Sequence, residues 1–146
     1  MPFHLALYDS CRYCQCVSGE LECAFLAETD LAAALVNQRQ YERGASLVIP
    51  KVHRETILDV SDAEIASMYR LARRLARAVE AAFGACAANV FQNNGIKAGQ
   101  HAPHMHVHVV TRYQSSDPER LFLQREFPII SMTEQKATAA AIRAAL

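Results

Sequence analysis

The sequence predicts an α+β domain in which an antiparallel sheet of about five strands packs against one long helix and a C-terminal helix. Two observations carry this prediction. An amphipathic segment, residues 61–83, stands between short runs of apolar and β-branched residues. The chain has 146 residues, 51% of them hydrophobic and 21% charged, and contains no repeat or linker. Residues 1–146 are therefore expected to form one domain with its own core.

The helix expected over residues 61–83 carries both a start and a stop signal. Ser61 and Glu64 have the spacing of a capping box, in which the two side chains bond free N–H groups of the first turn. Gly84 follows as a C-terminal stop. Apolar residues recur between these signals at three- and four-residue spacing and form one stripe: Ile65, Met68, Ala72, Leu75, Val79 and Phe83.

Shorter segments account for the rest of the expected fold. The alanine-rich tail, residues 133–146, is expected to form the second helix. Residues 117–128 match no element. The expected strands are residues 22–28, 31–36, 45–50, 87–92 and 103–112.

Charge and composition exclude several functional classes. Fifteen basic residues balance fifteen acidic ones, so no net field attracts nucleic acid, and the arginines of the long helix are interpreted as a solvated face. No apolar run reaches the ~20 residues that span a bilayer, and the N-terminus lacks a basic leader, which predicts a cytoplasmic protein without a membrane partner. Five cysteines, an odd number, argue against a disulfide framework. Cys23 and Cys86 are expected to be small buried apolar residues.

Four of the six histidines lie between residues 101 and 108. His104, His106 and His108 alternate with apolar residues, so in a strand they would share one face at a spacing of about 6.6 Å. Three interpretations are open: a histidine-rich surface strand, a metal site formed by these three residues, and nucleophilic catalysis by a neutral imidazole. The strict alternation argues against the first.

The segment before the histidines, residues 93–100, contains two glycines and no acidic residue. Gly95 and Gly99 allow positive φ, which lets several backbone N–H groups point at one anion. Asn93 and Gln100 add side-chain donors. The same composition occurs in ordinary turns, but directly before a histidine row it favours a phosphate site.

Together these residues resemble the histidine triad (HIT) family, in its bacterial zinc-bearing form. The resemblance covers about residues 11–113. It rests on Asn93-Asn94-Gly95-x-x-Ala98-Gly99-Gln100-x-x-x-His104-x-His106-x-His108-Val109-Val110, on Leu47-Val48-Ile49-Pro50-Lys51-x-His53 and on Cys11-x-x-Cys14-x-x-x-Ser18-Gly19-Glu20.

The resemblance implies a nucleotide hydrolase or transferase that is usually a homodimer. It would attack the α-phosphate of a nucleoside phosphoramidate, a dinucleoside polyphosphate or a related conjugate, most often of a purine, through a nucleotidyl-histidine intermediate. His106 would be the nucleophile, with His108 and Gln100 completing the catalytic set. The substrate-binding residues it implies are Asn37, Asn93, Gly99, His101 and His104.

Three positions depart from the family pattern. Ala45 stands where many members have histidine, and Asn37 aligns with an aspartate that binds the ribose. His101 replaces a serine or threonine that helps protonate the leaving group in some members, so an imidazole takes this role or the role is absent. These departures keep a rival function open, a nucleotide-binding regulatory protein with little or no turnover.

Cys11 and Cys14 have the spacing of a zinc-ligand pair, which needs two further ligands for a closed structural site. The resemblance supplies His53 and His104. Two free cysteines are the alternative, and Cys16 is close enough to be a ligand in place of one of them. A metal-storage or metal-sensing module, with more than one metal per chain, is a third possible function.

Overall fold

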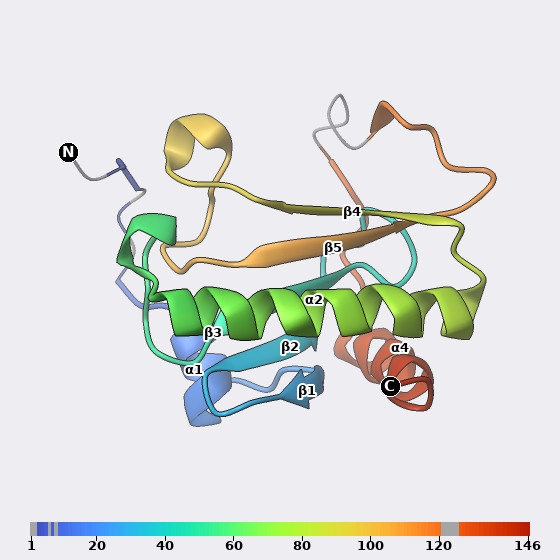
Figure 1. Cartoon of the computed structure of the whole chain (residues 1–146), viewed down its shortest axis with the longest axis horizontal. Coiled ribbons are helices and arrows are strands. Elements are labelled where there is room, and N and C mark those ends of the chain that lie inside the picture. Colours follow the sequence, from blue (N-terminus) through green and yellow to red (C-terminus); the bar gives the residue numbers. More distant parts are fainter. Residues whose placement is uncertain (1–2, 6, 8, 121–125) are drawn as a thin grey trace.

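The computed structural model describes residues 3–5, 7, 9–120 and 126–146 and confirms the α+β class (Figure 1). Five antiparallel strands form one sheet in the order β1-β2-β3-β5-β4. The strands are β1 (Phe25–Glu28), β2 (Ala32–Val36), β3 (Ser46–Pro50), β4 (Ala87–Gln92) and β5 (Val107–Arg112). The helices are α1 (Arg12–Ser18), α2 (Asp62–Phe83) and α4 (Met132–Arg143), with 3-10 turns η1 (Ile57–Asp59) and η2 (Ile96–Ala98). Residues 121–125, part of the segment that matched no element, lie outside the described residues.

The long helix α2 forms where its capping residues and periodicity predicted it. The carboxylate of Glu64 accepts the Ser61 N–H at 2.8 Å, and Gly84 ends the helix with a φ of 71°. The helix lies across one face of the sheet (Figure 1), and α4 packs beside it against β1 and β2. The core between these elements includes Leu26, Val36, Val48, Met68, Leu75, Val107, Val109 and Ile142.

Alternation along the strands sorts the side chains between the two faces of the sheet. Val107 and Val109 of β5 enter the helix-side core, as does Met105 before them. His108, between the two valines, therefore points to the opposite face. That face carries a smaller cluster of Ala33, Leu35, Leu47 and Ile49, which packs against Tyr13 and Val17 of α1.

Strand β1 begins at Phe25 rather than at residue 22, and α4 ends at Arg143 rather than at residue 146. Two further elements differ more clearly from the prediction. The fifth strand begins at Val107 rather than at residue 103, because the Met105 N–H donates to the carbonyl of Arg54 (2.6 Å) in the loop after β3. Helix α1 was not predicted at all. It has seven residues, too few for a hydrophobic period, and its contacts with the sheet hold it in place.

The expectations for three cysteines are also corrected. Cys16 and Cys23 form a disulfide, because the turn at Gly19 (φ 82°) folds the chain back after α1. Cys86, expected to be buried, is exposed just before β4. Strand β4 is an outer strand of the sheet, and no other strand among the described residues pairs with its free edge. No helix in the described part of the chain is long and apolar enough to cross a membrane.

Candidate active site and metal centre

His106 has the geometry of a nucleophile. It lies directly before β5, with 8% of its surface exposed. Its Nδ1 is 2.8 Å from the carbonyl oxygen of His104, to which a protonated Nδ1 donates. Burial lowers the pKa of His106 below its ordinary value, so the ring is neutral near physiological pH. Its Nε2 then carries a free lone pair, the form that attacks phosphorus.

His108 is held beside His106 by aromatic contacts. Its ring stacks on Phe91 of β4 with 4.6 Å between centroids, and it lies 4.8 Å from the ring of His106. Burial, with the nearby charges of His106 and Arg39, lowers the pKa of His108 to about 3. Its buried Nδ1 has no hydrogen-bond partner among the described residues, so the proton of the neutral ring is better placed on Nε2. His108 is thus a donor suited to a phosphate oxygen.

The two histidines border a cavity of about 260 Å³ on the sheet face away from α2. Tyr13, Leu35 and Leu47 supply an apolar wall, and Tyr13 packs on His106 with 5.4 Å between ring centroids. Burial raises the pKa of Tyr13 to about 12, so its hydroxyl stays neutral. The polar part of the lining includes Asn37, Gly99 and His101. The cavity therefore suits a ligand with one flat apolar part and one anionic part.

Asn37, Gly99 and His101 thus lie where the sequence placed them, next to His106 and His108. Asn37 accepts the Arg39 N–H through Oδ1 (3.0 Å), which leaves its NH₂ group as a donor. Gly99 adopts φ 83°, a left-handed conformation that a side chain would strain. A Cβ atom at this position would lie 3.7 Å from Nδ2 of Asn93, so Asn93 stands behind Gly99 rather than among the described lining residues.

Gln100 supports the loop and does not contact the cavity. Only 1% of its surface is exposed. Its Oε1 accepts the Gly95 N–H at 2.8 Å, and its Nε2 donates to the carbonyls of Glu55 (2.6 Å) and Ala102 (2.9 Å). The side-chain amide of Gln100 therefore has its hydrogen-bond partners within the protein. This geometry does not support the expected direct contact with phosphate. The bond from Gln100 to the Ala102 carbonyl spans residue 101 and helps to fix the backbone that carries His101.

Four side chains predicted as metal ligands do come together. The ligand atoms of Cys11, Cys14, His53 and His104 all lie within 4.8 Å of one another. Sulfur and Nδ1 atoms are separated by 3.2 Å (Cys11–His104), 3.3 Å (Cys14–His53) and 3.6 Å (Cys14–His104). Tetrahedral zinc, with Zn–S of about 2.3 Å and Zn–N of about 2.0 Å, places such pairs about 3.6 Å apart. The donor set therefore fits zinc.

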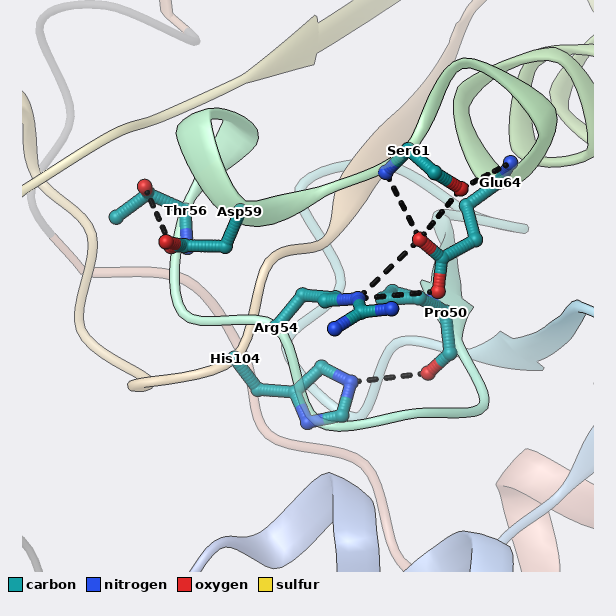
Figure 2. Close-up of polar contacts among 7 residues, drawn as sticks. All are labelled: Pro50, Arg54, Thr56, Asp59, Ser61, Glu64 and His104. Atoms are coloured by element: carbon teal, nitrogen blue, oxygen red, sulfur yellow. Dashed lines mark hydrogen bonds and ion pairs between the residues drawn. The ribbon is translucent and has the colours of Figure 1, made fainter.

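His104 belongs to this cluster and not to the cavity. It is fully buried, and its Nε2 lies 3.0 Å from the carbonyl of Pro50 (Figure 2). If Nε2 carries the proton and donates it there, Nδ1 keeps a lone pair for a metal. Both ring nitrogens are then committed, so the expected contact of His104 with substrate is not supported.

Hydrogen bonds at the start of α2 hold Arg54, the residue that follows His53 (Figure 2). Nε of Arg54 donates to both oxygens of Glu64, at 3.1 and 3.2 Å. Burial alone would raise the pKa of Glu64, but the hydrogen bonds from Ser61 and the Arg54 guanidinium lower it, so the carboxylate stays charged. The carbonyl of Arg54 in turn holds Met105. His53 is therefore fixed between α2 and the segment that precedes β5.

Comparison with known proteins shows where this site belongs. Residues 18–115 match the family described as the HIT domain. The chain belongs to the HIT family. It is 31% identical over 109 residues to "Protein hit" of Bacillus subtilis, covering 75% of each chain. It is 35% identical over 103 residues to adenosine 5'-monophosphoramidase hnt1 of Schizosaccharomyces pombe, covering 70% of this chain and 74% of that one. A Zn-bound histidine triad family protein from Mycobacterium smegmatis has a TM-score of 0.79 at 28% identity, covering 93% of this chain and 92% of that one.

Several lining residues of this HIT site were not foreseen. Tyr13 stands between the two cysteines of the metal cluster, and Arg12 precedes it. Arg39 follows Asn37 by two residues. For Arg12, Tyr13 and Arg39, the only signal in the sequence was that they lie within two residues of a predicted site residue. Gln135 of α4 also lines the cavity, and it lies beyond the 18–115 match, where the sequence offered no signal.

Acidification is expected to destabilise this HIT fold. The pKa of His108 falls from 6.5 to about 3 in the folded chain, so its contribution to stability is complete above pH 6.5 and lost as the pH falls toward 3. Within that window the free energy of unfolding should fall by about 1.4 kcal/mol per pH unit from this group. Denaturant titrations at several pH values measure the slope. His108→Phe should have a smaller slope, and an equal slope would contradict the assignment.

Proposed function

We propose that this HIT protein is a hydrolase that cleaves nucleotide conjugates at the α-phosphate through a nucleotidyl-histidine intermediate on His106. One observation carries the proposal. His106 is a neutral imidazole whose Nδ1 bonds the His104 carbonyl and whose ring borders the cavity beside His108. The relative named adenosine 5'-monophosphoramidase supports hydrolysis of a phosphoramidate or related bond and a purine nucleotide as substrate.

The residues of the cavity have distinct roles in this mechanism. Nε2 of His106 attacks the α-phosphorus, and the bond to the leaving group breaks with its electron pair on the leaving atom. The Nε2–H of His108 donates to a phosphate oxygen as charge develops there. The N–H of Gly99 is used within the loop, where it donates to the Ile96 carbonyl (3.1 Å), and the lack of a side chain at Gly99 leaves room for the phosphate. His101 supplies a proton when the leaving group needs one. Water then attacks the same phosphorus, releases the nucleoside monophosphate and restores His106.

The flat walls of the cavity position the rest of the nucleotide. Leu35 and Leu47 face the nucleobase, with Tyr13 on the α1 side. The NH₂ group of Asn37 donates to a ribose hydroxyl. Since an asparagine carries no charge, this contact contributes less than a carboxylate would.

We also propose that Cys11, Cys14, His53 and His104 hold a structural zinc ion. The fit of the donor distances and the Zn-bound relative from M. smegmatis support this. With four protein ligands the ion has no open position for substrate. When bound, zinc would act only by tying α1 to the sheet. Tyr13, between the two cysteines, would then be held against His106.

The decisive experiment combines product release with trapping of the intermediate. The purified chain is mixed with adenosine phosphoramidate and quenched within one turnover, and peptides are analysed by mass spectrometry. We expect AMP release and a nucleotidyl group on the peptide that contains His106. Steady AMP release with no such adduct would exclude the covalent route. Tight binding of AMP with no hydrolysis of adenosine phosphoramidate would favour the regulatory alternative. The departures at Asn37 and His101 keep that alternative open.

The homodimer and the cytoplasmic location stay predictions. The outer strand β4 leaves one edge of the sheet unpaired in the described chain, and Val90 on it is 41% exposed. This edge is where a second copy could continue the sheet.

A further inference from the structure

The cavity carries positive charge that cleavage at one phosphate does not require. Arg12, the first residue of α1, and Arg39, in the loop after β2, both line it. No aspartate or glutamate is among the described lining residues. Neither guanidinium takes part in the ion pairs found among the described residues. Two permanent charges therefore face the ligand without a carboxylate to neutralise them.

The loop that carries Arg39 is fixed by the C-terminal part of the chain. Arg39 forms an isolated β-bridge with Ile129, and the hydrogen bonds on either side of it join Gln38 to Ile130 (2.9 Å) and Gln40 to Pro128 (2.9 Å). The Arg39 N–H also donates to Asn37. The partner segment, residues 128–130, lies outside the HIT match of 18–115. This chain thus uses its own C-terminal segment to hold a cation at the cavity.

We propose that Arg39, assisted by Arg12, selects conjugates whose leaving group is itself an oxyanion, a phosphate chain or a sulfate, over conjugates that release a neutral amine. The inference rests on the proposed function. Arg39 and His108 line the same cavity. Guanidinium groups bind phosphate and sulfate oxygens through paired hydrogen bonds.

The selection follows from where the charge develops. When the bond between phosphorus and the leaving oxygen breaks, the electron pair stays on that oxygen as His106 bonds to phosphorus. A guanidinium beside the new oxyanion stabilises it without proton transfer. A departing amine must instead take a proton and leaves without negative charge, so it gains nothing from Arg39.

Three substrates with the same adenylyl group test the proposal: diadenosine tetraphosphate, adenylyl sulfate and adenosine phosphoramidate. For Arg39→Gln, we expect kcat/KM to fall by about 10- to 100-fold on the first two and less than about threefold on the third. Arg12→Gln should shift the same ratios by less. A loss confined to the tetraphosphate would identify the oxyanion as a phosphate chain, and an equal loss on the sulfate would extend it to both. Arg73→Gln, on the exposed face of α2, is the control and should change none of the values.

Two outcomes would overturn the selection. An equal loss on all three substrates would place Arg39 on the common adenylyl group, and no loss on any would remove it from the reaction. Binding to the His106→Ala chain gives a readout that does not need turnover. There, diadenosine tetraphosphate should bind at least about tenfold tighter than AMP, and Arg39→Gln should remove the difference. If the wild-type chain releases no AMP but the variant still binds diadenosine tetraphosphate more tightly than AMP, the proposed hydrolysis is wrong. The proposed selection by Arg39 is then still supported.

Discussion

Replacement of His106 by alanine is expected to lower the kcat of AMP release by about 10⁴-fold or more, the usual effect of removing a nucleophile. No other imidazole among the described residues has its Nδ1 bonded to the carbonyl of His104 and its other edge on the cavity. The fold should survive, because the lost hydrogen bond contributes only about 1 kcal/mol. The measurement is AMP release from adenosine phosphoramidate, alongside a thermal melt of the variant.

His4→Ala is the matched control, because His4 is exposed and outside the cavity. It should retain wild-type activity. Addition of free imidazole to a His106→Gly chain should restore part of the turnover, which a purely structural role of His106 would not allow. A kcat within tenfold of wild type for His106→Ala would exclude this residue as the nucleophile.

Loss of one side chain of the proposed zinc site is expected to have the second large effect, a fall in zinc content and in thermal stability. Cys14→Ala should remove the bound zinc, about one ion per chain in the wild type, and lower the Tm by about 5–10 °C. The reason is that zinc binding to the folded chain alone adds its binding free energy to the free energy of unfolding. Metal analysis and thermal melts with and without a chelator measure both changes.

The control for this prediction is Cys86→Ala. Cys86 is exposed, free and away from the cluster, so its removal should leave zinc content and Tm unchanged. Both variants remove one thiol, but only Cys14→Ala removes a proposed zinc ligand. Equal zinc content in Cys14→Ala and wild type would show that Cys14 is not a ligand.

A further consequence of metal loss concerns the active site. Tyr13 lies between Cys11 and Cys14, and its ring contacts both His104 and His106. Loss of zinc frees the start of α1, so activity should fall together with stability. Tyr13 thus links the proposed zinc site to the proposed nucleophile.

Much of the fold could be predicted because the relevant signals are local. The capping pair Ser61 and Glu64 lies within one helical turn, and the apolar stripe of α2 repeats every three or four residues. Strand alternation correctly assigned Met105, Val107 and Val109 to the core. Helix α1 was not predicted because its seven residues are too few to show a helical repeat of apolar residues. Contacts with distant strands stabilise it.

The roles of individual site residues were less accessible. Gln100 carries a side-chain amide that could donate to a phosphate. In the structure this amide forms hydrogen bonds with Gly95, Glu55 and Ala102 instead. His104 and His106 flank the same residue, Met105, but His104 contacts the cysteines and His106 borders the cavity. Such assignments depend on hydrogen bonds between residues far apart in the chain, which spacing alone does not reveal.

The sequence by itself determined the α+β class, the long helix, the family and the residue types of the histidine site. These properties follow from short periods, caps and motif spacing, in which each residue acts with its near neighbours. Only the tertiary structure decided that Cys16 pairs with Cys23, that the Gln100 amide bonds inside the protein, and that residues 128–130 hold Arg39 at the cavity. The physical reason is that bringing such residues together costs chain entropy, and the packing of the whole fold decides which contacts compensate that cost.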